Sequence, residues 1–318
     1  MFNILVLGGT GFVGRSVCAR LVERSGGASG SIVVPSRRMA RAKHIQLLPT
    51  VQVIEADVHD EAGLARLVAG RDAVVNLVAV LHGNQAAFQR VHVDLPAKLA
   101  RVCLAANVKR VVHVSALGVS DRAPSNYLRS KAAGELVLKS ARLDLSILRP
   151  SVIFGEHDRF LNLFATLQAV LPVLPLAGAH AQFQPVWVED VASAILRCLD
   201  NTASIGQTYE CAGPRVYTLK ELVELAGRLS GHARPVVALP DGLARLQAAA
   251  MELLPGEPLM SRDNIASMRV PNVASAQWPG LAALGITPAA LESIAPTYLS
   301  PGHGPARLDP WRAKAGRR

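Results

Sequence analysis

A glycine run near the start of the sequence has the spacing of a phosphate-binding turn. Gly8, Gly11 and Gly14 follow directly on the apolar segment 3–7, and a helical pattern begins at Phe12. Gly8 permits a tight turn, Gly11 lets the backbone approach a pyrophosphate, and Gly14 lets the helix pack closely on the strand. Free N–H groups and the helix dipole would favour the negative charge of a pyrophosphate at the N-terminus of this helix. We therefore expect a dinucleotide site that includes Gly8, Thr10, Gly11, Phe12, Val13 and Gly14.

The loop after the second expected strand is basic. An NAD site usually places an acid there to bind the ribose hydroxyls, whereas an NADP site has an arginine near the extra phosphate. This chain has Ser36, Arg37 and Arg38 at that position, and no acid. A guanidinium can bind a phosphate with two hydrogen bonds, although a solvated basic loop is the alternative interpretation. The loop predicts NADP(H) rather than NAD(H) as the cofactor.

The ends of two further strands should complete the cofactor site. Asp57 and Val58 end the third strand, where the carboxylate could accept a hydrogen bond from the adenine amino group. Asp57 could equally cap the helix that begins near Glu61. The end of the fourth strand should pass beneath the ribose and nicotinamide, unless its apolar residues belong to the sheet core: Leu77, Ala79 and Val80.

Short apolar segments alternate with helical patterns in the first half of the chain. The expected strands cover residues 3–7, 31–34, 51–55, 73–78, 110–114 and 145–148. Helical patterns cover residues 61–69, 94–106 and 130–140. This alternation predicts an α/β fold with a Rossmann-type, doubly wound parallel sheet.

The composition changes after Pro150, where stretches rich in Pro, Gly and Leu are typical of a smaller α+β cap region. The segment 185–192 continues into an apolar helix that should return to the sheet. Thr218 and Glu221 have the spacing of a capping box at the start of another helix. We predict an NADP(H)-binding Rossmann domain over residues 1–150, with 186–215 returning to it. A smaller substrate- or partner-side region should cover residues 151–185 and 216–318.

Composition and charge restrict the class of protein. Half of the 318 residues are hydrophobic and 18% are charged, which excludes a disordered chain. The net charge of +10 suits an anionic cofactor or an anionic membrane surface. No basic stripe with interspersed aromatic residues is present, so we do not expect nucleic acid as a partner. The densest basic block, residues 307–318, is either a solvated terminus or a tail that contacts anionic lipid or a partner.

Cysteine and histidine usage gives little sign of disulfides or metals. The widely separated cysteines fit a reducing compartment: Cys18, Cys103, Cys198 and Cys211. His92, His113 and His157 lack metal-ligand spacing, so no metal is expected. The chain starts without a basic leader, and prolines interrupt the apolar stretch 161–177. We expect a cytoplasmic protein, either soluble or peripheral on the inner membrane.

Three motifs together resemble the extended and atypical short-chain dehydrogenase/reductases over residues 1–222: the glycine run, Tyr127-x-x-x-Lys131 and the segment 148–155. Other details are similar to the nucleotide-binding accessory subunit of respiratory complex I and its bacterial relatives. These details are the segments 114–118, 132–135, 160–164, 185–192 and 253–256. The resemblance also implies that Pro150 belongs to the cofactor site.

The resemblance implies specific catalytic roles. In active members a tyrosine is the general acid/base, and a lysine four residues later lowers its pKa and holds the nicotinamide ribose. Tyr127 and Lys131 match this pair and lie one helical turn apart. An unperturbed phenol titrates near ~10, so a nearby ammonium is needed at neutral pH. In active members a serine or threonine hydroxyl binds the reacting oxygen. The corresponding position here is Ala116, and Ser115 could serve instead if the register shifts by one residue.

Three functions are consistent with these features. The first is a protein that holds NADPH as a largely structural cofactor in a complex I accessory or assembly role. The alternative is an NADP-dependent oxidoreductase or epimerase acting on a nucleotide-sugar or an isoprenoid- or quinone-type substrate. A redox-sensing regulator ranks last, because only the cofactor site supports it. The degenerate serine position leaves open whether the chain is an enzyme.

Overall fold

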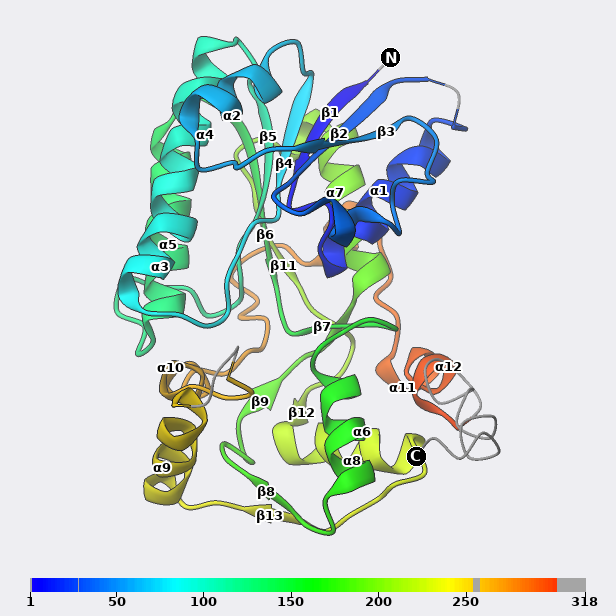
Figure 1. Ribbon diagram of the computed structural model, residues 1–318, viewed down its shortest axis with the longest axis vertical. Helices are drawn as coiled ribbons and strands as arrows, with labels where there is room; N and C mark the ends of the chain where they lie inside the picture. Colours follow the sequence, from blue (N-terminus) through cyan, green and yellow to red (C-terminus); the bar gives the residue numbers. More distant parts are fainter. Residues whose placement is uncertain (1, 28, 254–257, 302–318) are drawn as a thin grey trace. The chain divides into compact units, whose positions relative to one another are not determined.

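The computed structural model describes residues 2–27, 29–253 and 258–301, which form two compact units (Figure 1). The first unit contains residues up to 150, 188–211 and 275–287. The second unit contains the described residues within 151–187, 212–274 and 288–301. The segment 275–287, which we expected in the smaller region, therefore packs with the first unit. We describe each unit by itself.

A parallel sheet forms the centre of the first unit. Its seven strands among the described residues follow the order β11-β6-β5-β4-β1-β2-β3. Their bounds are Asn3–Leu7 (β1), Ser31–Ser36 (β2), Val51–Glu55 (β3), Ala73–Asn76 (β4), Arg110–Val114 (β5), Asp144–Pro150 (β6) and Thr208–Cys211 (β11). The strands β2 and β3 follow on one side of β1, and the strands from β4 onward follow on its other side. Folds of this kind bind ligands at this switch point between β1 and β4. The predicted Rossmann-type class is confirmed.

The strand ends differ from the prediction for local reasons. β2 continues through Pro35 to Ser36, because beyond Val33 it pairs only with β3 and can accommodate a residue without an N–H group. β4 ends at Asn76, two residues early. The Asn76 Oδ1 atom accepts a hydrogen bond from the Val78 N–H group at 3.2 Å, which turns the chain out of the sheet.

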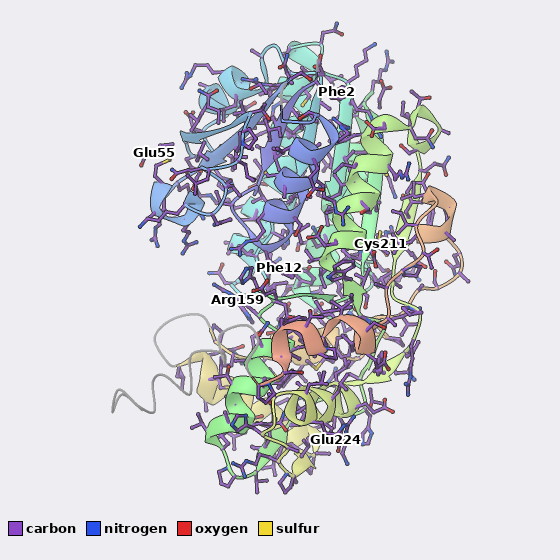
Figure 2. All side chains as sticks on the ribbon, turned by 90° about the vertical axis from the view of Figure 1, so that its right-hand side faces the viewer. Phe2, Phe12, Glu55, Arg159, Cys211 and Glu224 are labelled. Atoms are coloured by element: carbon purple, nitrogen blue, oxygen red, sulfur yellow. The ribbon has the colours of Figure 1, made fainter. Side chains whose placement is uncertain are left out.

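Helices cover both faces of this sheet. Figure 1 shows α2 (Glu61–Val68), α4 (Leu95–Ala105) and α5 (Asn126–Ser140) over one face. The other face carries α1 (Phe12–Arg24), which Phe12 opens in Figure 2, and α7 (Val188–Asp200). The short helix α3 (Gln85–Gln89) leads into a π-helical turn, Arg90–Asp94, just before α4. Short 3₁₀ turns cover Met39–Ala42, Thr202–Ser204 and Leu281–Leu284.

Helix α5 begins four residues earlier than the sequence pattern predicted. The Ser125 hydroxyl caps it by accepting a hydrogen bond from the Leu128 N–H group at 3.2 Å. Tyr127 therefore lies in the first turn of α5, and Lys131 follows one turn later. The cap fixes where the tyrosine and lysine stand relative to the end of β5.

The segment 275–287, called the strap here, crosses the β11 edge of the first unit. Ser275 donates two hydrogen bonds to the Glu210 carboxylate, at 2.6 Å from its backbone N–H group and 2.9 Å from its hydroxyl. The Glu210 N–H group donates to the Pro279 carbonyl oxygen at 2.9 Å. Leu281 and Leu284 are buried beyond this point. A buried carboxylate that accepts two hydrogen bonds from Ser275 thus anchors the strap to the sheet edge.

The second unit is an α+β arrangement of short elements. Its strands are Ile153–Phe154 (β7), Leu174–Leu176 (β8), Gln182–Phe183 (β9), Val186–Trp187 (β10), Tyr217–Thr218 (β12) and Val236–Ala238 (β13), paired as β10-β7, β12-β9 and β13-β8. Its helices are Leu161–Val170 (α6), Leu219–Leu229 (α8), Asp241–Glu252 (α9), Arg262–Ser267 (α10), Leu291–Ile294 (α11) and Pro296–Leu299 (α12). The expected capping box between Thr218 and Glu221 is present at the start of α8.

The core of the second unit lies where α6 packs against α8. Leu161 and Phe164 of α6 share one buried cluster with Leu222 and Val223 of α8. Among the described helices, none combines the length and apolar composition that a bilayer crossing requires. The basic segment 307–318 lies outside the described residues.

Candidate functional site

At the turn between β1 and α1, Gly9 and Gly14 have no room for a side chain. Gly8 has a φ of +82°, and a Cβ at Gly14 would lie 2.4 Å from the Gly8 carbonyl oxygen. Gly9 was not among the predicted residues, although a Cβ there would lie 2.7 Å from a methyl carbon of Val34. The turn and the first residues of α1 are therefore packed backbone to backbone. This geometry fits the close helix packing expected for a dinucleotide turn.

The start of α1 leaves its N–H groups available to a ligand. Gly11 is the N-cap residue, and no side chain caps the helix. The first turn of α1 contains no acidic residue. Thr10, Phe12 and Val13 are partly exposed beside it. An anionic pyrophosphate would fit here, because it would meet unscreened helix N–H groups rather than a carboxylate.

The basic loop after β2 presents two guanidinium groups. Arg37 and Arg38 are exposed, and no ion pair joins either to another described residue. Ser36 is buried, and its hydroxyl donates to the Arg38 carbonyl oxygen at 3.0 Å and lies 3.3 Å from the Arg38 N–H group. Ser36 thus fixes the backbone of the loop, and the two arginines extend from it.

Asp57 lies two residues after the end of β3, but it does not cap α2. Asp60, the residue directly before Glu61, accepts hydrogen bonds from Ala62 at 3.2 Å and Gly63 at 3.0 Å. The capping interpretation of Asp57 is therefore wrong, because the helix starts too late for its side chain to serve. The Asp57 carboxylate accepts instead from the His59 N–H group at 3.0 Å. Val58, between them, packs partly against the sheet core.

Further cations surround this end of the site. Arg90, from the π-helical turn, lies 3.9 Å from the Asp57 carboxylate. Lys98 Nζ, from α4, donates to the His59 carbonyl oxygen at 2.7 Å. Burial lowers the pKa of His59, and the charges of Arg90, Lys98 and Arg37 lower it further. Sequence reasoning missed Arg90 and Lys98, because they come from elements distant from the β2 loop in sequence.

The chain that follows β4 runs along the other half of the expected site. Leu77, Ala79 and Val80 are all at least partly exposed, so the interpretation of these residues as sheet core is wrong. The Val80 N–H group donates to His92 Nε2 at 3.2 Å. Asn76 bonds to His113 Nδ1 at 3.1 Å. His92 thus holds the Val80 end of this segment, whereas His113 joins the ends of the adjacent strands β4 and β5. Sequence reasoning treated both histidines as dispersed.

Tyr127 and Lys131 lie one turn apart on α5, and burial shifts the pKa of both side chains. The buried Lys131 ammonium donates to the Val114 carbonyl oxygen at 2.7 Å. Burial lowers the pKa of Lys131 to about 8, although Glu135 opposes this shift. Burial also raises the pKa of Tyr127 to about 12. The shift of the Tyr127 pKa is thus opposite in direction to the expected lowering, and the phenol holds its proton at neutral pH.

The hydroxyl side of the catalytic set is also incomplete. Ala116 occupies the position expected for the substrate-binding hydroxyl and is buried. The Ser115 hydroxyl lies beside the Glu135 carboxylate and helps to lower its pKa, but it makes no hydrogen bond of good geometry to the described residues. The adjacent Leu117 N–H group donates to the Pro150 carbonyl oxygen at 3.0 Å. Ser115 thus lies close to a carboxylate that Arg149 already binds.

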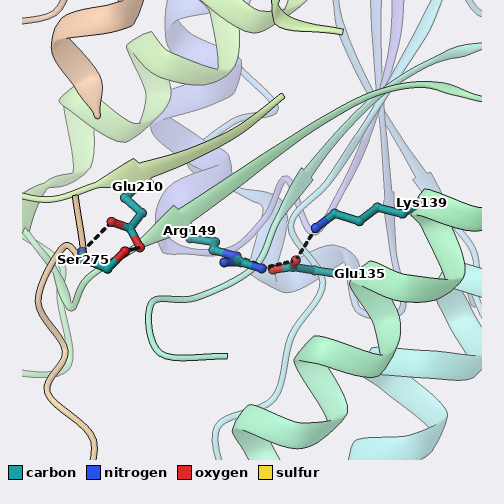
Figure 3. Close-up of polar contacts among 5 residues, drawn as sticks. All are labelled: Glu135, Lys139, Arg149, Glu210 and Ser275. Carbon is teal, nitrogen blue, oxygen red and sulfur yellow. Dashed lines mark hydrogen bonds and ion pairs between the residues drawn. The ribbon is translucent and has the colours of Figure 1, made fainter. Parts of the chain in front are cut away.

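Glu135 is the centre of a buried ion-pair cluster (Figure 3). Arg149 donates to both of its carboxylate oxygens, at 2.8 and 2.6 Å, and Lys139 lies 3.2 Å away. Burial raises the pKa of Glu135, but the hydrogen bonds and charge of Arg149 outweigh that effect and lower it. Arg149 and Lys139 also lie over the Trp278 ring of the strap, at 5.3 and 5.6 Å from its centroid.

Metal-binding and thiol chemistry find little basis in the described residues. Within them, no group of three or more His, Cys, Asp or Glu side chains could hold a metal ion. All four cysteines are buried and free. Burial raises the pKa of Cys18 and Cys103 to about 12 and that of Cys198 to about 11. Cys211, labelled in Figure 2, has its pKa raised by burial as well.

A glycine turn at the switch point of a doubly wound sheet, together with a Tyr-x-x-x-Lys helix that follows β5, defines a dinucleotide-binding α/β protein. Residues 4–212 match the model of the NAD dependent epimerase/dehydratase family. The chain belongs to that family. Its membership, together with the glycine turn, supports a nicotinamide dinucleotide as the cofactor.

Individual relatives make the resemblance more specific. The chain is 32% identical over 293 residues to the rat protein named NADH dehydrogenase (ubiquinone) 1 alpha subcomplex subunit 9, mitochondrial, covering 90% of this chain and 77% of the relative. It is 28% identical over 242 residues to a ceramide reductase of Caulobacter vibrioides, covering 75% and 74%. The structure of DesIV, a dTDP-glucose 4,6-dehydratase from Streptomyces venezuelae, shares the fold, with 22% identity, a TM-score of 0.71 and coverage of 98% and 97%.

Proposed function

We propose that this chain holds NADP(H) as a largely structural cofactor and serves as an accessory or assembly protein of respiratory complex I. The observation that carries the proposal is the difference between a complete binding turn and an incomplete catalytic set. The turn at Gly8 to Gly14 can receive a pyrophosphate. Ala116 replaces the expected hydroxyl, and burial raises the pKa of Tyr127 to about 12. A site of this kind can bind a dinucleotide without promoting proton transfer.

The choice of NADP(H) over NAD(H) rests on charge at the adenosine end. Arg37 and Arg38 are exposed at the end of β2 and have no acidic partner among the described residues. Arg90 and Lys98 add positive charge nearby. A ribose 2′-phosphate would be recognised by this set, since guanidinium groups bind phosphate with two hydrogen bonds.

Each part of the site would have a separate task when the cofactor binds. The N–H groups at the start of α1 would hold the pyrophosphate, and the chain from Leu77 to Val80 would line the nicotinamide side. Lys131 would donate to the nicotinamide ribose. A bound nicotinamide supplies hydride transfer, and the chain's own residues then decide whether a proton can accompany it. Tyr127 would keep its proton at neutral pH.

The proposed partner is a respiratory membrane complex, which would make the chain peripheral on the inner membrane. The rat relative carries the name of a subunit of such an enzyme. Helix α9 of the second unit supplies a surface for the contact. Ala244 and Ala248 of α9 are buried, whereas Leu243 and Leu246 are 54% and 67% exposed. Exposed leucines on one helix favour a protein or lipid contact.

The first experiment is to release and identify any nucleotide that copurifies with the chain. Its absorbance at the reduced-nicotinamide band is then followed over hours with candidate carbonyl substrates. We expect NADPH that leaves slowly and is not oxidised. Rapid oxidation by a carbonyl substrate would contradict the structural role, and a chain with no affinity for any dinucleotide would contradict the cofactor.

An NADP-dependent oxidoreductase or epimerase is the second candidate. The retained pair Tyr127 and Lys131 on α5 favours it, and one relative is named a ceramide reductase. Its substrate would be a nucleotide-sugar or an isoprenoid- or quinone-type molecule. If this candidate is correct, purified protein will oxidise NADPH with such a substrate, and Tyr127→Phe will abolish the reaction.

A further inference from the structure

A π-helical turn, Arg90–Asp94, interrupts the helical run between α3 and α4. Turns of this type are rare and occur often at functional sites, because they rotate side chains out of the regular helical positions. Here the turn directs residues to both ends of the expected cofactor site. Arg90 lies near Asp57 at the adenosine end, and His92 lies against α5 at the nicotinamide end.

His92 is buried, with 2% of its surface exposed, and both ring nitrogens have partners. Nε2 accepts from the Val80 N–H group at 3.2 Å, so the neutral ring carries its proton on Nδ1. Nδ1 lies 2.8 Å from the Ser130 hydroxyl and donates to it. Ser130 donates in turn to the Tyr127 carbonyl oxygen at 2.8 Å. A continuous chain of hydrogen bonds thus joins the segment after β4 to the first turn of α5.

Packing holds this connection rigidly. The His92 ring meets the Tyr127 ring edge to face, with centroids 5.5 Å apart, and stacks on Phe88 at 5.6 Å. A Cβ at Gly134 would lie 1.9 Å from the His92 carbonyl oxygen, so the π-helical turn rests directly on the backbone of α5. Burial, together with the charge of Lys131, lowers the pKa of His92 to about 3, so the ring stays neutral at physiological pH.

We propose that His92 is a positioning residue of the dinucleotide site, which sets the backbone of Val80 against the helix that carries Tyr127 and Lys131. This inference rests on the proposed cofactor, because Val80 lies on the expected nicotinamide side. His92 acts through Val80 and Tyr127 and does not itself contact the dinucleotide. It controls the nicotinamide half of the site, whereas the glycine turn and the β2 loop control the adenosine half.

The test compares the whole cofactor with its adenosine fragment. His92→Phe keeps a ring between Phe88 and Tyr127 but removes both hydrogen bonds. Dissociation constants for NADPH and for 2′,5′-ADP are measured by titration calorimetry on the full chain. We expect NADPH to bind about tenfold more weakly, the size of one or two lost hydrogen bonds, and 2′,5′-ADP to bind within about twofold of wild type.

His113→Phe is the matched control. His113 is similarly buried, at 3% exposed, but its ring bonds to Asn76. The control should leave the ratio of the two affinities unchanged, whatever it does to stability. An equal loss of both affinities in His92→Phe would reduce His92 to a packing role, and unchanged affinities would also overturn the proposal. A wild-type chain that binds neither compound would refute the proposed cofactor itself.

A second measurement on the wild-type chain covers the case in which His92→Phe does not fold. The ring nitrogens of His92 are observed by ¹⁵N NMR in the free chain and with each compound. We expect the pattern of a neutral ring protonated on Nδ1 and a shift on adding NADPH that 2′,5′-ADP does not produce. An identical response to both compounds would overturn the proposal.

Discussion

The glycine turn and the Tyr127 helix belong to the same unit and would face the same cofactor, yet they retain their expected chemistry to different degrees. At the turn, Gly8 and Gly14 meet the steric demands of a dinucleotide site, and no carboxylate blocks the start of α1. At the helix, the phenol keeps its proton and the neighbouring hydroxyl position is an alanine. The comparison teaches that a binding turn and a proton-transfer set depend on different side chains of one fold, so one can change without the other.

Substitution of Gly14 should have the largest effect at the binding end. Gly14→Val places a Cβ 2.4 Å from backbone atoms that cannot move aside. We expect loss of NADPH binding and a fall of about 3 kcal/mol in the free energy of unfolding. Denaturant unfolding and NADPH titration measure the two effects. Gly242→Ala is the control, since a Cβ at Gly242 has no neighbour within 4 Å. Retained binding in Gly14→Val would show that close packing at this turn is dispensable.

Glu135→Gln should have an effect nearly as large as that of Gly14→Val, and it should act on the stability of the fold. The substitution leaves Arg149 buried without its anionic partner, which typically costs about 3 kcal/mol. The folded-state pKa of Glu135 lies below its ordinary value of 4.5, so its stabilising contribution is complete above that value and is lost as the pH falls below it. Unfolding curves recorded between pH 3 and 7 should therefore converge for wild type and variant at the acidic end. Parallel curves would contradict the ion-pair account.

Removal of the two loop arginines should change cofactor choice more than stability. In Arg37→Ser combined with Arg38→Ser, we expect NADPH affinity to fall about 100-fold, as when two charged hydrogen bonds of about 1.5 kcal/mol each are lost. NADH affinity should change less than about threefold, because NADH lacks the 2′-phosphate. Fluorescence titration with each cofactor gives the ratio. Arg41→Ser is a control from the same loop region, and a proportional loss of both affinities would place the arginines outside the phosphate site.

The smallest expected effect is a pH dependence at Lys131. Burial lowers its pKa to about 8, so the ammonium that would hold the ribose is lost above that pH. NADPH affinity should therefore decline a few-fold between pH 7 and 9, and more slowly if the bound cofactor stabilises the charge. Over the same window stability should rise, since the unfolded chain binds the additional proton. Lys131→Met should give a flat affinity profile, and an equally steep profile in this variant would assign the titration to another group.

The sheet and the glycine turn could be predicted because their signals are local. Strands such as Val51–Glu55 and Arg110–Val114 are short apolar runs bounded by polar residues, and both were found with their observed bounds. Gly8, Gly11 and Gly14 follow a strand directly, so their roles depend on nearby residues alone.

The parts that could not be predicted depend on contacts between distant segments. Nothing in the sequence around Trp278 shows that it would lie over Arg149, and nothing around His92 shows that its ring would receive the Val80 N–H group. The residues of the π-helical turn show no simple hydrophobic periodicity. The helical pattern over residues 94–106 therefore predicted α4 but not the turn before it. The high pKa of Tyr127 likewise arises from burial by the folded chain. Asp60, in contrast, was open to prediction, since it directly precedes the helix.

The burial of all four native thiols has a practical consequence. Cys18, Cys103, Cys198 and Cys211 are inaccessible in the folded chain, and their raised pKa values keep them protonated and slow to react with maleimides. A single cysteine introduced at Leu246 on α9 should therefore take up a fluorophore selectively, without prior removal of the native ones. The labelled chain would report directly, through its emission, when this helix becomes covered by a partner.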